Sequence, residues 1–239
     1  MSHLPATPIM LEQLPFFQDL SLEERTQAAP LFRVENLRRG TLLAGRGFQH
    51  LERYQNTVYF LFRGVAALYT ATRQNSRKIL FFLGPGQLLN HNVLDTKPVS
   101  LFAEIVEDAI LLSIPRQDFL DLLCRFPSLT AALLRHYETR LWRMSHQLKN
   151  TAGYIPVERK LAIKLMKLAQ DFGVERPDGL LIPITLTVTQ LADFVGVPRE
   201  TASRACKKLG EVGLLRYEDK KFILPNRAGL AAYYREGTL

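Results

Sequence analysis

The sequence predicts an α+β chain in which a long helix joins an N-terminal β-rich part to a C-terminal winged helix-turn-helix. Between about residues 31 and 114, short apolar runs are separated by turns, a pattern typical of an antiparallel sandwich or roll. Residues 128–152 carry leucine at every seventh position, which indicates a long helix with an apolar seam. Residues 186–224 combine two short helical patterns with a β-hairpin pattern, as a winged helix-turn-helix does.

Composition limits the class of protein. The chain has 239 residues, of which 47% are hydrophobic, enough for two modest domains with their own cores. Its formal net charge of +8 is compatible with a polyanionic partner. The two cysteines, Cys124 and Cys206, lack the spacing of a disulfide framework or a zinc site. Neither a signal peptide nor a stretch long enough to span a membrane is indicated, so we expect no membrane contact and a cytoplasmic location.

The N-terminal part is expected to begin with a polar stretch and a short helix. Ser21 can cap this helix, because acidic residues follow it in the first turn, where negative charge is favourable. The apolar runs expected as strands lie at 41–43, 58–62, 65–69, 79–83, 101–105 and 109–114. Gly64 and the Gly-Pro-Gly sequence at 84–86 are expected as turns between strands.

Two helices are expected after the strands, at 115–124 and 128–152. The seam of the longer helix has two alternating positions: Leu134, Leu141 and Leu148 at the first, and Tyr137, Met144 and Thr151 at the second. Such a seam favours pairing with a second copy of the helix, whereas packing on its own domain is the alternative. The sequence at 153–156 breaks the helical pattern and is expected as a hinge. A helix at 157–172 and two short strands flanking Pro183 are expected next.

The most informative stretch is 186–209. Thr187 can cap a helix, and Gln190 stands three residues later, where a capping box places its second partner. Gly196 lies where the chain must turn sharply, and glycine adopts positive φ at little cost. Pro198 suits the start of a second helix, because its missing N–H is not needed there. The residues expected on the outer face of the second helix are Arg199, Glu200, Ser203, Arg204, Lys207 and Lys208, with Ala202, Ala205, Cys206 and Leu209 facing inward.

That outer face suits the major groove of DNA. An arginine side chain can donate two hydrogen bonds to guanine, and a glutamate can accept one from cytosine. Phosphate contacts are expected from Thr187, Thr189, Thr201, Lys207 and Lys208. The hairpin expected at 212–224 would add a wing with Lys220 at its tip, also near phosphate. An ordinary helical hairpin with a solvated charged face is the alternative interpretation.

The segment GVPRETASRACKKL resembles the recognition region of the CRP/FNR family of bacterial transcription regulators. Arg199, Glu200 and Arg204 match the positions by which the catabolite-activator branch reads DNA. Glu200, Ser203 and Arg204 also match the E-x-x-S-R triplet of the fumarate-nitrate branch. Upstream, residues 59–89 resemble the β-roll, or double-stranded β-helix, of the cyclic-nucleotide-binding fold, so the resemblance covers most of the chain.

This resemblance implies a homodimer that pairs through the helix at 128–152, binds an inverted-repeat operator in double-stranded DNA and contacts RNA polymerase. Residues 1–125 would form the sensor domain, 126–153 the dimerisation helix and hinge, and 154–239 the winged helix-turn-helix domain. A signal in the sensor domain would change the spacing of the two recognition helices. The alternative is a ligand-binding module that acts through protein contacts. Motifs of common enzyme classes are missing from the sequence, so we expect no catalysis.

The resemblance leaves the effector open and argues against two of the family's cofactors. In the family's cAMP pocket, a glutamate follows the last glycine of the phosphate cassette, and an arginine-serine pair holds the cyclic phosphate. Here Gln87 follows Gly86, and Val99 precedes Ser100, so the guanidinium contact is lost. An N-terminal iron–sulfur cluster requires a set of cysteines, and none precedes Cys124.

We therefore expect an unidentified small molecule between the roll and the long helix. The candidate pocket residues are Gly86, Gln87, Ser100, Tyr137, Trp142 and Ser145. Of these, Trp142 is expected to face the roll of its own subunit, with plain core packing as the alternative. Haem is an alternative, because His91 lies close to the haem-ligating position of a third branch, although a loop histidine without a ligand is the other interpretation. The histidines expected at the surface are His50, His136 and His146. Redox control through Cys206 is a further alternative to simple packing of that side chain.

Overall fold

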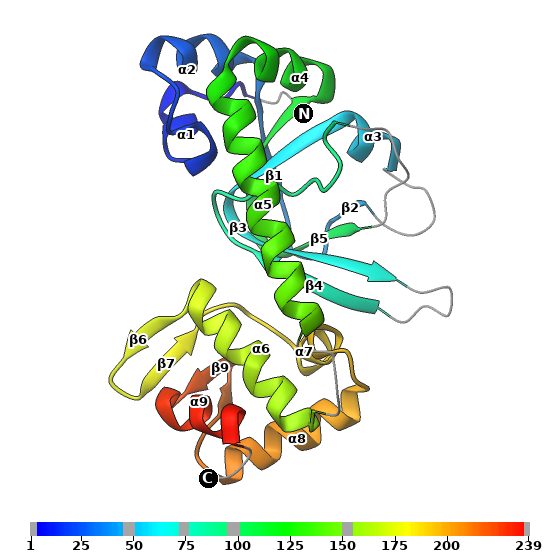
Figure 1. Ribbon diagram of the computed structural model, residues 1–239, viewed down its shortest axis with the longest axis vertical. Coiled ribbons are helices and arrows are strands. Elements are labelled where there is room, and N and C mark those ends of the chain that lie inside the picture. Colours follow the sequence, from blue (N-terminus) through cyan, green and yellow to red (C-terminus); the bar gives the residue numbers. More distant parts are fainter. Residues whose placement is uncertain (1–3, 45–50, 72–76, 95–100, 150–154, 237–239) are drawn as a thin grey trace. The chain divides into compact units, whose positions relative to one another are not determined.

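The computed structural model describes residues 4–44, 51–71, 77–94, 101–149 and 155–236 (Figure 1). Backbone contacts divide the chain into two units. The first unit comprises residues 1–68 and 83–146, and the second comprises residues 69–82 and 147–239. The predicted α+β class is confirmed, with an antiparallel sheet in the N-terminal part, a long helix, and a helix-turn-helix near the C-terminus.

The first unit begins with two short helices, α1 (Pro8–Glu12) and α2 (Leu22–Ala28), of which only the second was expected. Ser21 caps α2 as predicted. Its hydroxyl accepts the N–H of Glu24 at 3.2 Å, and the Glu24 carboxylate accepts the N–H of Ser21 at 2.7 Å. This capping box satisfies two amides that have no partner within the helix.

The strands described in the roll are β1 (Arg33–Leu37), β2 (Leu42–Ala44), β3 (Thr57–Ala71), β4 (Arg77–Leu83) and β5 (Phe102–Pro115). Their order is β1-β5-β3-β4, and β2 also pairs with β5. Both β1 and β2 run antiparallel to β5, with Arg33 opposite Ser113. A short helix, α3 (Leu51–Asn56), precedes β3.

The predicted turn at Gly64 is wrong. The strands β3 and β5 are each one long strand where the pattern indicated two shorter ones. Gly64 lies inside β3 with a φ of +94°. A side chain there would collide with the main chain of Asp108 and Ala109, so the glycine allows β5 to pass close to β3. The pattern of apolar runs also failed to predict α3 and β1. The sequence of β1, RVENL, contains only two apolar residues.

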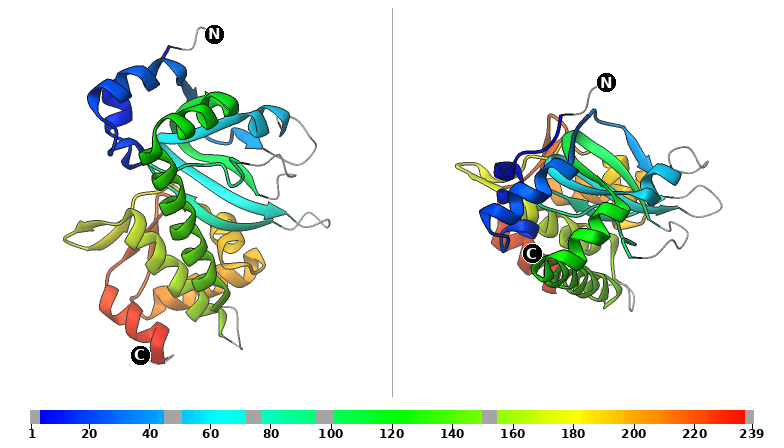
Figure 2. Two further views of the ribbon diagram at one scale, coloured as in Figure 1. Left: turned by 45° about the horizontal axis from the view of Figure 1, so that its top comes forward. Right: turned by 90° about the horizontal axis from the view of Figure 1, so that it is seen from above.

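An aromatic cluster packs the N-terminal segment and α4 against the roll. The rings of Phe16, Phe17, Phe32, Phe60 and Phe119 are each at most 7% exposed. The ring centroid of Phe60 lies 4.9 Å from that of Phe16 and 5.0 Å from that of Phe17, which is a favourable range for aromatic pairs. Phe119 belongs to α4 (Arg116–Arg125), which leads into α5 (Pro127–Lys149) (Figure 2).

The second unit contains α6 (Val157–Phe172), β6 (Val174–Arg176), β7 (Gly179–Ile182), α7 (Val188–Val195), α8 (Arg199–Glu211), β8 (Arg216–Glu218), β9 (Lys221–Leu224) and α9 (Arg227–Glu236). Its antiparallel sheet has the order β6-β7-β9-β8. The prediction that two strands flank Pro183 is wrong, because β6 and β7 both precede this residue. Strand β7 ends at Ile182, since a proline has no N–H to donate to the next ladder hydrogen bond. The unexpected α9 packs on α6, where Arg159 donates to the Tyr234 carbonyl at 2.8 Å.

Candidate nucleic-acid interface and effector region

Helix α7 begins and ends with the residues that the sequence predicts. The Thr187 hydroxyl accepts the N–H of Gln190 at 3.1 Å, and the Gln190 side-chain oxygen accepts the N–H of Thr187 at 3.0 Å. At the other end, Gly196 has a φ of +87°, and its N–H donates to the Ala192 carbonyl at 2.7 Å. Because glycine adopts this angle without steric cost, the turn toward α8 depends on Gly196.

Helix α8 packs through small residues and leaves its polar face in solvent. Ala202, Ala205 and Leu209 are at most 2% exposed. The two alanines allow α7 to approach closely. On the opposite face, all four residues expected to read bases are exposed: Arg199, Glu200, Ser203 and Arg204. The sequence therefore placed the inner and outer faces of this helix correctly.

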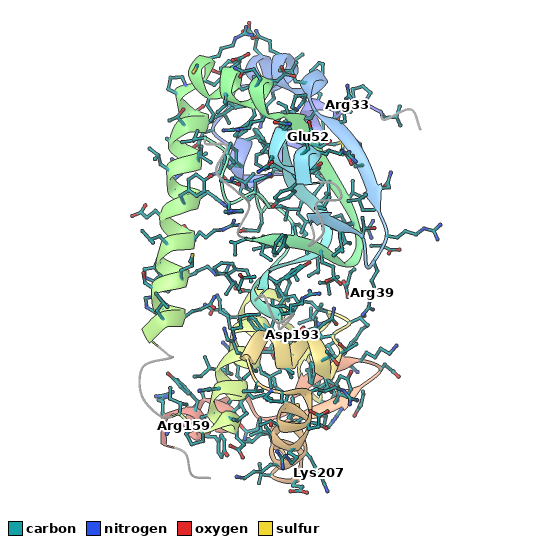
Figure 3. All side chains as sticks on the ribbon, turned by 90° about the vertical axis from the view of Figure 1, so that its right-hand side faces the viewer. Arg33, Arg39, Glu52, Arg159, Asp193 and Lys207 are labelled. Atoms are coloured by element: carbon teal, nitrogen blue, oxygen red, sulfur yellow. The ribbon has the colours of Figure 1, made fainter. Side chains whose placement is uncertain are left out.

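The two lysines at the end of this face differ in their surroundings. The Lys207 side chain is 80% exposed, and its amine lies 3.8 Å from the Glu211 carboxylate (Figure 3). The Lys208 amine instead lies 3.1 Å from the Glu158 carboxylate of α6. The hydrogen bond that the Lys208 amine donates to this carboxylate raises the pKa of Lys208. Because Lys208 is partly neutralised by Glu158, Lys207 is the better placed of the two for a phosphate.

The three threonines expected near phosphate also differ. The Thr187 hydroxyl takes part in the cap of α7. Thr189 is exposed in the first turn of the same helix, and Thr201 is half-buried in the first turn of α8. Thr189 is therefore the threonine whose side chain the structure leaves most accessible.

Strands β8 and β9 form the predicted hairpin. Asp219 and Lys220 have φ angles of 50° and 60°, as both central positions of a type I′ turn require. The Tyr217 hydroxyl donates to the Leu186 carbonyl at 2.9 Å, and the Leu186 N–H donates to the Lys220 carbonyl at 2.8 Å. These bonds fix the hairpin to the segment that leads into α7, and the Lys220 side chain remains exposed.

In the first unit, the glycine-containing segment after β4 is bonded to β3. The Gly86 N–H donates to the Leu61 carbonyl at 2.8 Å, and the Leu61 N–H donates to the Gln87 carbonyl at 2.9 Å. Gly86 has a φ of +86°, and a Cβ there would lie 2.9 Å from the Pro15 side chain. Ser100, the other candidate of this cassette, lies outside the described residues.

Two side chains of α5, three residues apart, bond the helix to the segment that follows the cassette. The Tyr137 hydroxyl accepts the N–H of Val93 at 3.2 Å. Arg140 donates to the Leu88 carbonyl at 2.8 Å and to the Asn90 carbonyl at 3.4 Å. Arg140 is only 8% exposed, and burial lowers its pKa to about 10. Arg140 was not among the expected residues, although its i+3 spacing from Tyr137 places both on one face of the helix.

Trp142 and Ser145 lie on another part of the surface of α5. Trp142 is 59% exposed, and its ring centroid lies 3.8 Å from that of His146. The prediction that Trp142 faces the roll is therefore wrong, because it lies about 200° around the helix from the buried Arg140. Ser145 is exposed, and its hydroxyl donates to the Leu141 carbonyl at 3.0 Å.

His136 is half-buried, which corrects its predicted surface position. Its Nε2 atom is buried and has no hydrogen-bond partner among the described residues. Burial and then the charge of Arg140 lower the pKa of His136 to about 3 and that of His91 to about 4. Both imidazoles are therefore neutral at pH 7. His146 is exposed as expected, and His50 lies outside the described residues.

The structure also bears on the redox, metal and membrane questions. Burial raises the pKa of the Cys206 thiol to about 11, whereas a redox-reactive cysteine has a lowered pKa. Within the described ranges, no group of three or more His, Cys, Asp or Glu side chains could hold a metal ion. In the same part of the chain, no helix has the length and apolar character needed to cross a membrane.

Known proteins match both parts of the chain. Residues 37–125 match the cyclic nucleotide-binding domain family, and residues 159–233 match the Crp-like helix-turn-helix domain family. The CRP-like cAMP-activated global transcriptional regulator of Mycobacterium tuberculosis is 24% identical over 175 residues, which are 73% of this chain and 78% of the relative. The cyclic AMP receptor protein of Thermus thermophilus is 29% identical over 160 residues, which are 66% of this chain and 70% of the relative.

A solved structure shows the same fold. A CooA mutant from Carboxydothermus hydrogenoformans is similar with a TM-score of 0.71 and 17% sequence identity, over 98% of this chain and 98% of that chain. The two family matches lie on the two parts of the chain that carry the roll and the helix-turn-helix. The curated relatives are transcription regulators and not enzymes. This chain is a transcription regulator that belongs to the CRP/FNR family.

Proposed function

We propose that the chain acts as a homodimer that reads an inverted-repeat operator under the control of an effector sensed by its N-terminal part. The observation that carries this proposal is the outer face of α8, where Arg199, Glu200, Ser203 and Arg204 are all exposed. Arginine and glutamate at these positions can pair with guanine and cytosine edges, and each well-formed pair contributes about 1–3 kcal/mol of discrimination. These four residues would supply the base contacts.

Phosphate contacts would come from residues around that face. Thr189, Lys207 and Lys220 of the expected set are exposed. Thr201, half-buried, and Thr187 and Lys208, which bond within the chain, would contribute less. Such contacts fix the register on the duplex without reading its sequence.

The apolar stripe of α5 supports dimerisation. Leu134, Leu141 and Leu148 recur every seven residues and are 64%, 66% and 69% exposed. Leucines at this spacing are buried when two helices pair as a coiled coil. Trp142 and Met144 extend the same exposed apolar surface. Tyr137, expected at the second seam position, bonds to Val93 instead, so we propose that the leucines with Trp142 and Met144 form the contact.

A two-fold dimer would place two copies of α8 in successive major grooves, about 34 Å apart. We propose that residues 1–125 act as the sensor, 126–153 as the dimerisation helix and hinge, and 154–239 as the DNA-binding domain. Contact with RNA polymerase and a cytoplasmic location belong to the same proposal.

We propose an effector other than cAMP. The relatives from Mycobacterium tuberculosis and Thermus thermophilus are named for cAMP. This chain lacks the glutamate and arginine that hold the cyclic nucleotide in that branch, because Gln87 and Val99 stand at those positions. A haem-based sensor would act through His91, whose imidazole is neutral and so suited to metal binding.

The proposal is tested by selecting bound sequences from a random double-stranded DNA pool with the purified full-length protein. Enrichment of a two-fold-symmetric motif is the expected result. A parallel selection in cell extract supplies an effector if DNA binding requires one. Failure to enrich any motif in both selections, with the dimer intact, would favour a module that acts through protein contacts.

A further inference from the structure

We propose that Glu158 of α6 competes with the DNA phosphates for Lys208 of α8, and so weakens binding to DNA of any sequence. This inference rests on the proposed function and deepens it, because it assigns to one carboxylate a role in the strength of DNA binding and not in base reading. Glu158 is a positioning residue in this account, since it acts through Lys208.

The two side chains come from different helices of the second unit. The Lys208 amine donates to the Glu158 carboxylate at 3.1 Å, although the residues are 50 positions apart in the sequence. The Lys208 side chain is 61% exposed and that of Glu158 only 24%, so the carboxylate is the more enclosed partner. The pair joins the C-terminal half of α8 to the first turn of α6.

The start of α6 fixes the Glu158 carboxylate. Glu158 is the second residue of this helix, where the N–H groups of the first turn favour negative charge. A hydrogen bond from its own main-chain N–H lowers the pKa of Glu158, as does the bond from Lys208, so the carboxylate is ionised at pH 7. The neighbouring Arg159 donates at 2.8 Å to the carbonyls of Tyr234 and Arg235, which anchors the same turn to α9. The carboxylate is therefore positioned by contacts outside α8.

Lys208 lies where a phosphate contact is expected from the proposed docking of α8. It stands four residues after Arg204, about one turn further along the exposed side of the helix. An amine that is bonded to a carboxylate attracts a phosphate less, and the carboxylate itself repels the phosphate. Phosphates are the same in every sequence, so Glu158 should weaken the binding of operator and random DNA alike.

The adjacent Lys207 has a different carboxylate partner. Its amine lies 3.8 Å from the carboxylate of Glu211 on the same helix, and the two side chains are 80% and 62% exposed. An ion pair between two such exposed side chains is weak and is screened by salt, so a phosphate can replace Glu211 readily. The enclosed Glu158 is a stronger competitor, and this difference separates the two lysines.

The test measures the salt dependence of binding to the selected operator and to a random duplex of equal length, by fluorescence anisotropy with the full-length protein. Glu158→Gln should bind both duplexes more tightly and should steepen the slope of log affinity against log salt by about 0.9, the value for one additional phosphate contact. Its gain in affinity should therefore shrink about 3.5-fold between 50 and 200 mM salt. Glu175→Gln removes an exposed carboxylate that is paired with Arg227 of α9, and it measures the effect of a charge change alone.

The variant Lys208→Gln separates competition for the lysine from simple repulsion of DNA. Alone, it should leave the slope near the wild-type value, because Glu158 already occupies Lys208. In its presence, Glu158→Gln should change the slope no more than Glu175→Gln does. The same gain with and without Lys208 would overturn the inference, and so would a loss of about 0.9 in Lys208→Gln alone, which would mean that Lys208 already contacts a phosphate.

The outcomes also distinguish this inference from the proposed function. Specific operator binding by the wild-type protein, with an unchanged salt slope in a folded Glu158→Gln variant, would contradict the inference alone. The unfolding temperature of each variant shows that it is folded. A wild-type protein that binds neither duplex, with or without cell extract, would contradict the proposed function itself.

Discussion

At the scale of single residues, two glycines of the first unit share a backbone angle but differ in their surroundings. Gly64 has a φ of +94°, and a Cβ there would meet the main chain of Asp108 and Ala109. Gly40 has a φ of +84°, and a Cβ there would meet nothing within 4 Å. The pair therefore separates the cost of the backbone angle from the cost of a steric collision.

We predict that Gly64→Ala lowers the free energy of unfolding by about 2–5 kcal/mol, since it combines an unfavourable angle with overpacking. Gly40→Ala should cost only about 1–2 kcal/mol, from the angle alone. Urea denaturation of both variants measures the difference. Equal losses would mean that the close passage of β5 does not constrain Gly64.

The buried histidines make the protein sensitive to acid. The pKa of His136 is lowered from 6.5 to about 3, and that of His91 to about 4. The unfolded chain therefore binds more protons once the pH falls below about 6.5, so this contribution to stability is present above that pH and is lost toward pH 4. We predict that the unfolding temperature falls from pH 7 to pH 5 and that His136→Gln makes the fall shallower. His146→Gln, the exposed control, should retain the wild-type slope.

At the scale of elements, α5 has two faces with different tasks. Arg140 and Tyr137 bond one face to the segment at 88–93, and the leucines of the stripe are exposed on the other face.

We predict that Leu141→Lys converts the dimer to a monomer, as measured by size-exclusion chromatography with light scattering, because a buried lysine disrupts the seam. The same variant should lower operator affinity at least tenfold. Thr139→Lys lies about 200° away around the helix and should leave the dimer intact. A dimer that survives Leu141→Lys would place the interface elsewhere.

The hairpin of β8 and β9, the wing, is a second element whose proposed contact with phosphate can be measured. Lys220→Ala should reduce the salt slope of DNA binding by about 0.9, as expected for one lost phosphate contact, and should weaken all sequences alike. Arg227→Ala removes an exposed positive charge from α9 and is the matched control. An unchanged salt slope in Lys220→Ala would remove the hairpin tip from the DNA contact.

Local patterns predicted the elements that depend on neighbouring residues. The caps at Ser21 and Thr187 and the inner face of α8 follow from spacings of three or four residues. The failures involve residues distant in sequence. A glycine is needed at position 64 because a side chain there would collide with the main chain of Asp108, on another strand. Tyr137 was expected in the seam, but its hydroxyl accepts a hydrogen bond from the N–H of Val93. No local pattern contains either contact.

At the scale of the whole molecule, one chain combines an exposed polar face on α8, an exposed leucine stripe on α5 and a buried arginine, Arg140, that bonds α5 to the segment at 88–93. The reading face was predictable because a helix presents its outer residues by periodicity alone. The role of Arg140 was not predictable, since Arg140 resembles an ordinary surface residue of an amphipathic helix until the segment at 88–93 is placed against it.

The measurement that tests the central claim most directly is the ratio of operator affinity to random-DNA affinity for Arg204→Ala and Lys207→Ala. Arg204→Ala should cost about 1–3 kcal/mol on the operator and relax base preference in each half-site, so the ratio falls. Lys207→Ala should weaken operator and random DNA together, so the ratio stays at the wild-type value. Equal ratios in the two variants would contradict the assignment of base reading to the outer face of α8.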